Sequence, residues 1–302
     1  MTDAEPASDT TIGAALAPLR LRYAHWMGLD PDSVLADREE PADEIRAMQL
    51  VVRIERAEPP SWTLALSAAA TGAALVCLDR RSDPGGEWFG AVAAYCDGHI
   101  RKVTRRARAG QWSACADLPG LTVERVGMIP GPEVGAELRV GAEGGQAADD
   151  PAAVVRAEVR VLVPALVTEL DARISRLQVG GTDVPTDRAV VPDQDQDDAL
   201  HLWLPPEPQM TLGKTMAQTG HAGMIAAALM AGDDQPATKR WRDNGCPTIV
   251  HGRDDGWPTL SAAVRDAAAG WRDERLLAVR DAGFTEIAPG TITVIARAPR
   301  SS

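Results

Sequence analysis

The chain has 302 residues, of which 45% are hydrophobic and 25% are charged, a balance typical of a globular protein with one large or two ordinary domains. Its formal net charge of −12 argues against broad, non-specific binding to nucleic acids, although a local basic patch can still bind phosphate groups. No apolar run is long enough for a membrane span, and the acidic first residues lack the basic and apolar regions of a secretory signal. The 4 cysteines form no C-x-x-C pair, so we expect buried thiols in a cytoplasmic protein rather than disulfides or a zinc site.

The first 46 residues are rich in Ala, Pro and Asp. Within them, Leu16, Leu19, Tyr23 and Met27 follow the spacing of one helix face, which predicts a short helix docked on the body of the protein. From residue 47 to residue 178, strand and helix patterns follow one another, and we expect a first domain there. The predicted strands cover 48–54, 100–104, 121–126 and 157–163, and the predicted helices cover 61–78, 87–96, 112–117 and 166–177, with a low-complexity loop at 141–153.

Residues 179–198 are rich in Gly, Pro and Asp, and we interpret them as a solvated linker to a second domain at 199–302. Because strands and helices alternate in both ranges, the fold class is α/β, with helices covering a mixed sheet in each of two tandem domains. In the second domain the predicted strands cover 200–204, 247–251, 276–280 and 291–296, and the predicted helices cover 212–230, 237–244 and 257–269.

The similar order of elements in the two ranges indicates an internal duplication. An ungapped alignment of residues 61–76 with residues 212–227 pairs Gly72 with Gly223. Further along, the Pro-Gly dipeptide at 130–131 matches the Pro-Gly dipeptide at 289–290. The prediction therefore rests on element order and on a few shared glycines rather than on overall identity.

Polar residues gather on one face of the helix predicted at 212–230. At about 100° per residue, Lys214, Gln218 and His221 lie within one narrow stripe. Small residues such as Gly213 allow a ligand or the sheet to approach this helix closely. A stripe of this kind near a helix N-terminus suits a site that binds an anion and polarises an ester, although an ordinary solvent-exposed face has the same composition.

A second polar cluster follows the strand predicted at 276–280. Asp281 comes directly after that strand, and Thr285 and Thr293 lie close to it in the sequence. Ligands of α/β proteins bind at the carboxyl ends of strands, so these three residues can face the stripe on the helix. The alternative is an Asx-turn followed by two threonines that merely favour strand structure.

The two segments together resemble the type II peptidyl-tRNA hydrolases of archaea and eukaryotes, over about residues 199–302. The residues that carry the resemblance are Gly213-Lys214-x-x-Ala217-Gln218-x-x-His221-Ala222 and Asp281-Ala-Gly-x-Thr285-x-Ile287-Ala288-Pro289-Gly290-x-x-Thr293. The resemblance implies hydrolysis of the ester between a peptide and the terminal ribose of tRNA, without a metal or a cofactor. It also implies a four-stranded mixed sheet flanked by helices, in a family that is commonly dimeric.

The resemblance implies roles for individual residues. It places Lys214, His221, Asp281, Thr285 and Thr293 in the catalytic site, and it matches Gln218 and Gly213 to the motif that binds substrate. Either Asp281 or His221 assists a water molecule as general base, and the sequence leaves the choice open. Lys214 stabilises a phosphate or the developing oxyanion, while the two threonines orient water or the ester carbonyl.

The sequence departs from the family at two places. Glu286 stands where the family usually has Gln, and the segment at 205–212 is rich in proline and lacks the basic residues that the family often carries there. Both changes lower the expected affinity for tRNA, because they add or leave negative charge near an anionic substrate.

The first domain is expected to be an inactive copy that packs on the second and replaces the family's dimer within one chain. In the ungapped alignment, the candidate positions are occupied by Thr63, Ser67, Ala70, Thr122 and Val126. This half nevertheless has a basic run at 101–108, in which Arg101, Lys102 and Arg105 are candidates for contact with tRNA phosphates. The alternative is a charged strand edge that prevents aggregation.

Two functions remain in view: a peptidyl-tRNA hydrolase, or a non-catalytic module that binds tRNA or a protein partner. Hydrolysis of a different ester or amide on the same scaffold is a third possibility. A basic cleft that contains Lys214, Arg253 or Arg280 would favour the enzyme, and a closed acidic cleft would favour the module. No membrane partner is expected, and a homodimer is an alternative to the internal pair of domains.

Overall fold

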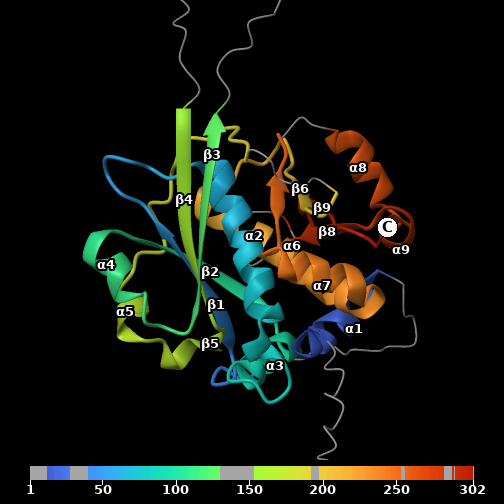
Figure 1. Ribbon diagram of the computed structural model, residues 1–302, viewed down its shortest axis with the longest axis horizontal. Helices are drawn as coiled ribbons and strands as arrows, with labels where there is room; N and C mark the ends of the chain where they lie inside the picture. Colours follow the sequence, from blue (N-terminus) through green and yellow to red (C-terminus); the bar gives the residue numbers. More distant parts are fainter. Residues whose placement is uncertain are drawn as a thin grey trace, which may run out of the picture.

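The computed structural model describes residues 12–27, 40–129, 153–191, 197–252, 256–281, 288 and 290–301. Its strands form two mixed sheets (Figure 1), and corresponding strands have the same spatial order in both sheets. In each sheet the first pair of strands is parallel and the other pairs along the path are antiparallel. The first sheet has the order β2-β1-β4-β3, with β1 (Arg46–Arg53), β2 (Arg101–Ala107), β3 (Gly120–Ile129), β4 (Ala153–Leu162) and the short β5 (Ala165–Leu166) beside β1. The second sheet has the order β7-β6-β9-β8, with β6 (Leu200–Trp203), β7 (Thr248–Val250), β8 (Leu276–Arg280) and β9 (Ile292–Arg297).

Two long helices lie between the sheets, and side chains at their first residues fix where they begin. Ser61 and Thr211 are the N-caps, and their hydroxyl oxygens accept hydrogen bonds from the backbone N–H of Leu64 and Lys214. Some of the other helices pack in the central core beside the long ones, and others pack in smaller clusters on the far side of each sheet. The full set is α1 (Ala17–Trp26), α2 (Trp62–Leu78), α3 (Phe89–Asp97), α4 (Ala109–Ala114), α5 (Ala172–Ser175), α6 (Leu212–Asp233), α7 (Gln235–Asp243), α8 (Trp257–Ala263) and α9 (Ala267–Glu274), with 3-10 turns at Ala14–Leu16, Arg80–Ser82 and Val167–Glu169. None of the helices in the described ranges is long and apolar enough to cross a membrane.

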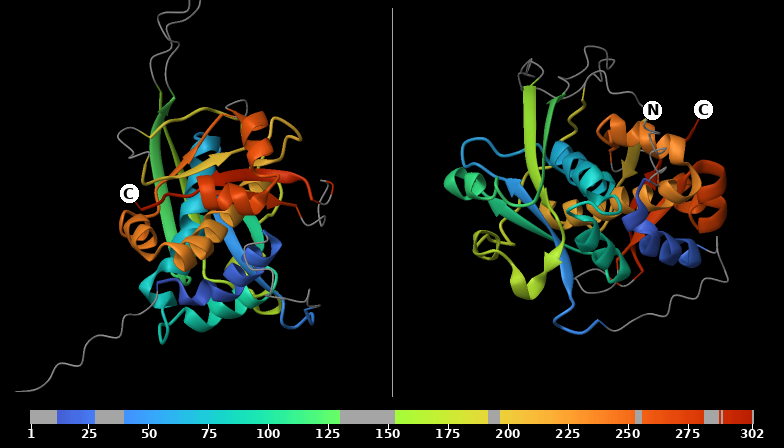
Figure 2. Two further views of the ribbon diagram at one scale, coloured as in Figure 1. Left: turned by 90° about the vertical axis from the view of Figure 1, so that its right-hand side faces the viewer. Right: turned by 60° about the horizontal axis from the view of Figure 1, so that its bottom comes forward.

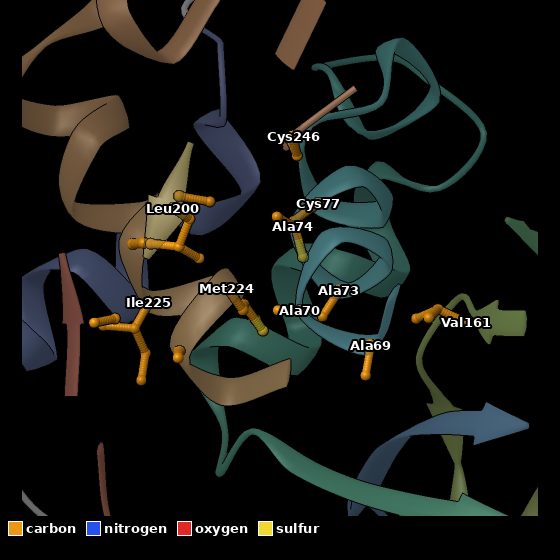
Figure 3. Close-up of a cluster of buried hydrophobic side chains, with 14 of the residues drawn as sticks. Ala69, Ala70, Ala73, Ala74, Cys77, Val161, Leu200, Met224, Ile225 and Cys246 are labelled. Carbon is orange, nitrogen blue, oxygen red and sulfur yellow. The ribbon is translucent and has the colours of Figure 1, made fainter. Parts of the chain in front are cut away.

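Small residues allow α2 and α6 to pack backbone to backbone. A Cβ atom on Gly223 would lie 2.3 Å from the carbonyl oxygen of Ala70, so only glycine fits at that point of contact. Figure 3 shows Met224 of α6 beside Ala70 of α2 where the two helices meet. This pairing joins the two sheets into one hydrophobic core, in which alanine, valine and leucine predominate.

Hydrogen bonds connect each long helix to the far strand of the opposite sheet. The Ser67 hydroxyl of α2 donates to the carbonyl oxygen of Thr248 in β7, at 2.7 Å. The Thr104 hydroxyl of β2 donates to the carbonyl oxygen of Gly213 in α6, also at 2.7 Å. Each helix therefore belongs to both sheets, and β2 is held directly against the first turn of α6.

The close contact at Gly223 gives a direct test of this packing. Gly223→Ala is expected to lower the free energy of unfolding by about 1–3 kcal/mol, because the new methyl group collides with backbone that cannot move aside. Gly90→Ala in α3 is the matched control, since a Cβ atom there has no neighbour within 4 Å. That change should stabilise the protein by up to ~1 kcal/mol through helix propensity alone. Urea denaturation of both variants makes the comparison, and equal stabilities would contradict the tight contact.

The predicted α/β class with two tandem sheets is confirmed, but two predicted helices differ from the structure. The segment at 166–177 forms β5, a 3-10 turn and the single turn α5. Its helical spacing reflects packing, because Leu170, Ile174 and Leu177 all contact the outer face of the first sheet. The segment at 257–269 is divided at Asp266, whose carboxylate accepts from the backbone N–H of Ala269 and so begins α9.

The linker predicted at 179–198 is partly bound to the first sheet and its helix. The carboxylate of Asp187 accepts hydrogen bonds from the backbone N–H groups of Trp62 and Thr63, at 3.0 Å each. Val190 forms a β-bridge with Met128 of β3. Asp187 and Val190 are therefore held against α2 and β3, so this part of the predicted linker packs on the N-terminal half.

The two aligned glycines have different surroundings. A Cβ atom on Gly72 would meet Val161 of its own sheet, whereas one on Gly223 would meet the other long helix. Aligning the helices on their N-caps, Ser61 with Thr211, shifts the match by one residue. In that alignment Leu64, Ala68 and Thr71 correspond to Lys214, Gln218 and His221. Of the Pro-Gly pairs, Pro130, Gly131 and Pro289 lie outside the described residues.

Candidate active site

A cleft of about 670 Å³ lies between the stripe on α6 and elements of the N-terminal half. One wall carries Lys214, Gln218 and His221 of α6, and Asp281 lies at the end of β8. The opposite wall comes from β2 and α1, which lies beside α3 and α6 (Figure 2). Most of the predicted site residues that the structure describes therefore line one cavity.

Asp281 is the only carboxylate among the described residues that line the cleft. It follows β8, and its backbone N–H donates to the carbonyl oxygen of Thr291 at 3.0 Å, which holds the residue at the strand end. The side chain is nearly buried, and its Oδ2 atom lies 3.6 Å from Lys214 Nζ. The same atom accepts a hydrogen bond of 3.2 Å from Gln218 Nε2. The carboxylate is thus oriented by one cation and one amide.

Gln218 connects Asp281 to Thr293. The Thr293 hydroxyl donates to Gln218 Oε1 at 2.8 Å, so the amide must present its Nε2 group to the carboxylate. Thr293 is completely buried and is not among the residues that line the cleft. Thr293 is thus linked to Asp281 through Gln218, and its contact with water or the ester stays a prediction. Thr285, the other threonine of this prediction, lies outside the described residues, as do Glu286 and Arg253.

His221 lies against a lysine from the other half of the chain. Its Nδ1 atom is 3.4 Å from Lys102 Nζ, although 119 residues separate the two in sequence. Gly220 makes room for this lysine, since a Cβ atom there would lie 3.0 Å from Lys102 Cδ. Burial, and then the nearby positive charge of Lys102, lower the pKa of His221 well below its ordinary 6.5. The imidazole is therefore neutral at physiological pH.

Lys102 itself is set into the protein rather than directed to solvent. Its Nζ atom lies 3.4 Å from the Tyr95 hydroxyl and 3.4 Å from Met224 Sδ. Burial lowers its pKa from 10.5 to about 8, so the ammonium group loses its proton more readily than an exposed lysine does. From the sequence, Lys102 is predicted to contact a tRNA phosphate from a basic strand. In the structure, Lys102 lies beside His221 in the lining of the cleft.

Replacing this lysine should change the titration of the histidine. Lys102→Met is expected to raise the pKa of His221, because the like charge disappears, while burial keeps that pKa below 6.5. In the wild type the imidazole should stay neutral as the pH falls through 6.5, and in the variant protonation should begin at a higher pH. NMR titration of the His221 ring protons measures both. Lys239→Met, at an exposed lysine of α7, is the control and should leave the titration unchanged.

The basic run at 101–108 is divided between the two faces of β2. Lys102 and Thr104 point to α6, and strand alternation turns Arg105 to the other face. There Arg105 donates to Gln49 Oε1 at 2.8 Å and to the carbonyl oxygen of Leu177 at 2.9 Å, and it does not line the cleft. Arg101 lies at the rim, where it pairs with Glu40. The predicted patch of Arg101, Lys102 and Arg105 is therefore not one surface.

Gly213 lines the cleft, but its backbone groups have partners within the protein. Its N–H donates to the Thr182 hydroxyl at 3.2 Å, and its carbonyl oxygen accepts from Thr104. The expected role in binding substrate is thus limited to leaving space, since a side chain there would approach Thr182 to 2.8 Å.

Residues of α1 form a part of the cleft that the motifs did not reveal. Arg22, Tyr23 and Trp26 line the cleft from α1. The helical spacing around Tyr23 predicted the helix correctly, but nothing in the sequence indicated that it would meet a site more than 190 residues away. The basic residues among the described lining are Arg22, Arg101, Lys102, Lys214 and Arg280, so the cleft is locally basic in an acidic chain.

Comparison with protein families supports the resemblance found in the motifs. Residues 201–302 match the family model described as peptidyl-tRNA hydrolase PTH2. No curated protein matches the chain. The matched range contains α6, β8 and β9, which supply Lys214, Gln218, His221 and Asp281 to the cleft. The C-terminal part of this chain, residues 201–302, is therefore similar to the peptidyl-tRNA hydrolase PTH2 family.

Proposed function

We propose that the protein hydrolyses the ester bond of peptidyl-tRNA, or of N-blocked aminoacyl-tRNA, and releases the peptide and free tRNA. The observation that carries the proposal is one basic cleft in which a hydrolase-family domain gathers Lys214, Gln218, His221 and Asp281. An anionic substrate is attracted to such a cleft even though the whole chain is acidic, because local charge decides close contacts. Action on tRNA also fits a cytoplasmic protein.

In the proposed reaction Asp281 is the general base. A water molecule attacks the ester carbonyl carbon and gives a proton to the carboxylate, and a tetrahedral intermediate forms with negative charge on the carbonyl oxygen. When the bond to the ribose oxygen breaks, that oxygen takes the proton from Asp281 and leaves as a hydroxyl group, which returns Asp281 to its carboxylate form. His221 is the weaker candidate, because its Nδ1 atom already lies against Lys102 Nζ at 3.4 Å, whereas Asp281 lies beside Lys214 and Gln218.

Lys214 is proposed to stabilise the negative charge of the intermediate. Its ammonium group lies near the carboxylate, so the charge that develops on the substrate oxygen arises within reach of both groups. Gln218, fixed by Thr293, keeps Asp281 in the orientation that the reaction needs. Thr285 completes the site in this proposal by analogy with the family.

The whole chain is proposed to consist of an accessory segment at 1–46, a domain at 47–178, a linker at 179–198 and a second domain at 199–302. The first of these domains is proposed to be an inactive copy of the second. The identical strand order of the two sheets supports a duplication. Aligned on the helix caps, Leu64 and Ala68 stand where the active half has Lys214 and Gln218. The linker residue Asp187 also occupies the N-terminus of α2, so that helix end is not open to a substrate.

Release of free tRNA from an N-acetylated aminoacyl-tRNA tests the proposal. The wild-type protein should turn over many equivalents of substrate, and the rate should fall steeply with added salt, because the substrate is a polyanion. Folded wild-type protein that binds the substrate without hydrolysing it would contradict the proposal and support the non-catalytic binding module. Turnover of a simple ester but not of the tRNA ester would identify a different hydrolase on the same scaffold.

A further inference from the structure

Part of the cleft lining is an aromatic surface that lies outside the family domain. Trp26 is 59% exposed, which is unusual for a large apolar side chain, and it lines the cleft together with Tyr23. The two rings are 5.2 Å apart and meet edge to face at 62°. Exposed aromatic surface at the rim of a cavity marks a place where a ligand binds.

The surface is held in place by contacts that leave the Trp26 ring exposed. The Arg22 guanidinium donates to the carbonyl oxygens of Gly98 and Asp97, at 2.6 Å each, and so fixes α1 to the end of α3. Leu19, one helical turn before Tyr23, is completely buried in the core. Tyr23 is partly buried behind Trp26. A rigid, exposed ring of this kind binds a flat ligand at little cost in side-chain entropy.

Charge shows which flat ligand fits. Arg22 lies one helical turn before Trp26 on α1, where its guanidinium donates to backbone carbonyl oxygens, and Arg101 of β2, which pairs with Glu40, also lines the cleft. An aromatic side chain beside a cation is the usual arrangement for a nucleotide in single-stranded nucleic acid, in which the base stacks and the phosphate is neutralised. An apolar peptide side chain would need the ring but not the cations.

The volume of the cleft limits the bound part of a ligand to about one nucleotide. Its volume of about 670 Å³ is within the range of small-ligand cavities, which is roughly 300–1,000 Å³. One nucleotide fits there, whereas a folded nucleic acid does not, so only a single-stranded end can enter. The same cavity continues to Lys214 and Asp281, where the ester is proposed to react.

We propose that Trp26, in edge-to-face contact with Tyr23 and one helical turn after Arg22, is a stacking site for the 3′-terminal base of the tRNA substrate. The inference rests on the proposed function, because that function supplies a nucleotide next to the scissile ester. Residues 12–27 thereby add a substrate subsite to the hydrolase domain, from a segment that the family match does not include. The N-terminal half takes part in substrate recognition although it lacks the catalytic groups.

Binding of the trinucleotide CCA to the full chain, measured by titration calorimetry, tests the subsite without any hydrolysis. The wild type should bind CCA more tightly than a trinucleotide whose 3′ nucleotide lacks its base. Trp26→Ala should weaken CCA binding about 5- to 150-fold, the range for loss of one stacked base, and should abolish the preference for the base. Trp26→Phe should retain most of the binding, because phenylalanine also stacks.

Val154→Ala, at a residue of β4 that is 67% exposed and outside the cleft lining, is the control and should bind CCA like the wild type. Equal binding by wild type and Trp26→Ala, equal binding of CCA and the abasic probe, or no binding of CCA at all would each overturn the inference.

Measuring hydrolysis by the same variants separates the subsite proposal from the proposed function. Trp26→Ala should raise KM for the N-acetylated aminoacyl-tRNA and leave kcat nearly unchanged. A protein that binds CCA through Trp26 but hydrolyses nothing would retain the subsite and lose the proposed function.

Discussion

Asp281→Asn is expected to lower kcat for N-acetylated aminoacyl-tRNA by about 10²- to 10⁴-fold, the range for loss of a general base. The amide has the size of the carboxylate, and its oxygen can still accept the hydrogen bond from Gln218, so the fold should be retained. What the amide cannot do is take a proton from water at neutral pH. Single-turnover kinetics with saturating enzyme measure the chemical step directly, and circular dichroism checks the fold.

Two further variants make this result specific. Asp243→Asn, at an exposed residue of α7, is the control and should hydrolyse the substrate at the wild-type rate. His221→Ala should reduce the rate less than Asp281→Asn does, because His221 lies against Lys102 rather than beside Lys214 and Gln218. If instead the Asn variant keeps its activity and His221→Ala loses it, the general base is His221 and the assignment made from the cleft geometry is wrong.

Lys214→Met is expected to lower kcat by about 10²- to 10³-fold, the usual effect of removing one group that stabilises an oxyanion. The methionine preserves the length of the side chain and removes its charge. The effect should fall on kcat rather than on KM, because the negative charge arises only in the transition state. Steady-state kinetics over a range of substrate concentrations separate the two constants.

The matched control is Lys239→Met, which removes an exposed lysine from α7 and should leave both constants unchanged. A Lys214→Met variant with a raised KM and an unchanged kcat would show that the lysine holds a phosphate in the ground state. The sequence left this choice open, and the contact with Asp281 is the reason for expecting the effect on kcat.

Local patterns in the sequence predicted much of the fold. The long helices begin next to their capping residues Ser61 and Thr211, and the strands follow the apolar alternation of their segments. These features depend on neighbours in the chain, which is why they could be recognised without the structure. The segment at 166–177 was predicted wrongly because its apolar residues pack on the first sheet from a turn, and packing of that kind imitates helical spacing.

The site was predictable to the extent that its residues share a motif. Lys214, Gln218 and His221 lie on one helix face, and the end of a strand brings Asp281 to them. The distribution of the basic run was not predictable, because its charges divide between the two faces of β2 and only the packed sheet shows which face meets α6. For the same reason the hydrogen bond from Thr293 to Gln218 was not predictable.

The sequence by itself determined the α/β class, the order of elements and the hydrolase motif. Each of these can be identified from the spacing of residues that lie close together in the chain. The tertiary structure alone decided that Lys102 lies against His221, that Asp187 closes the N-terminus of α2, and that Trp26 lines the cleft. These contacts join residues far apart in the chain, and the one between Lys102 and His221 depends on the close approach between the two halves that Gly220 and Gly223 allow.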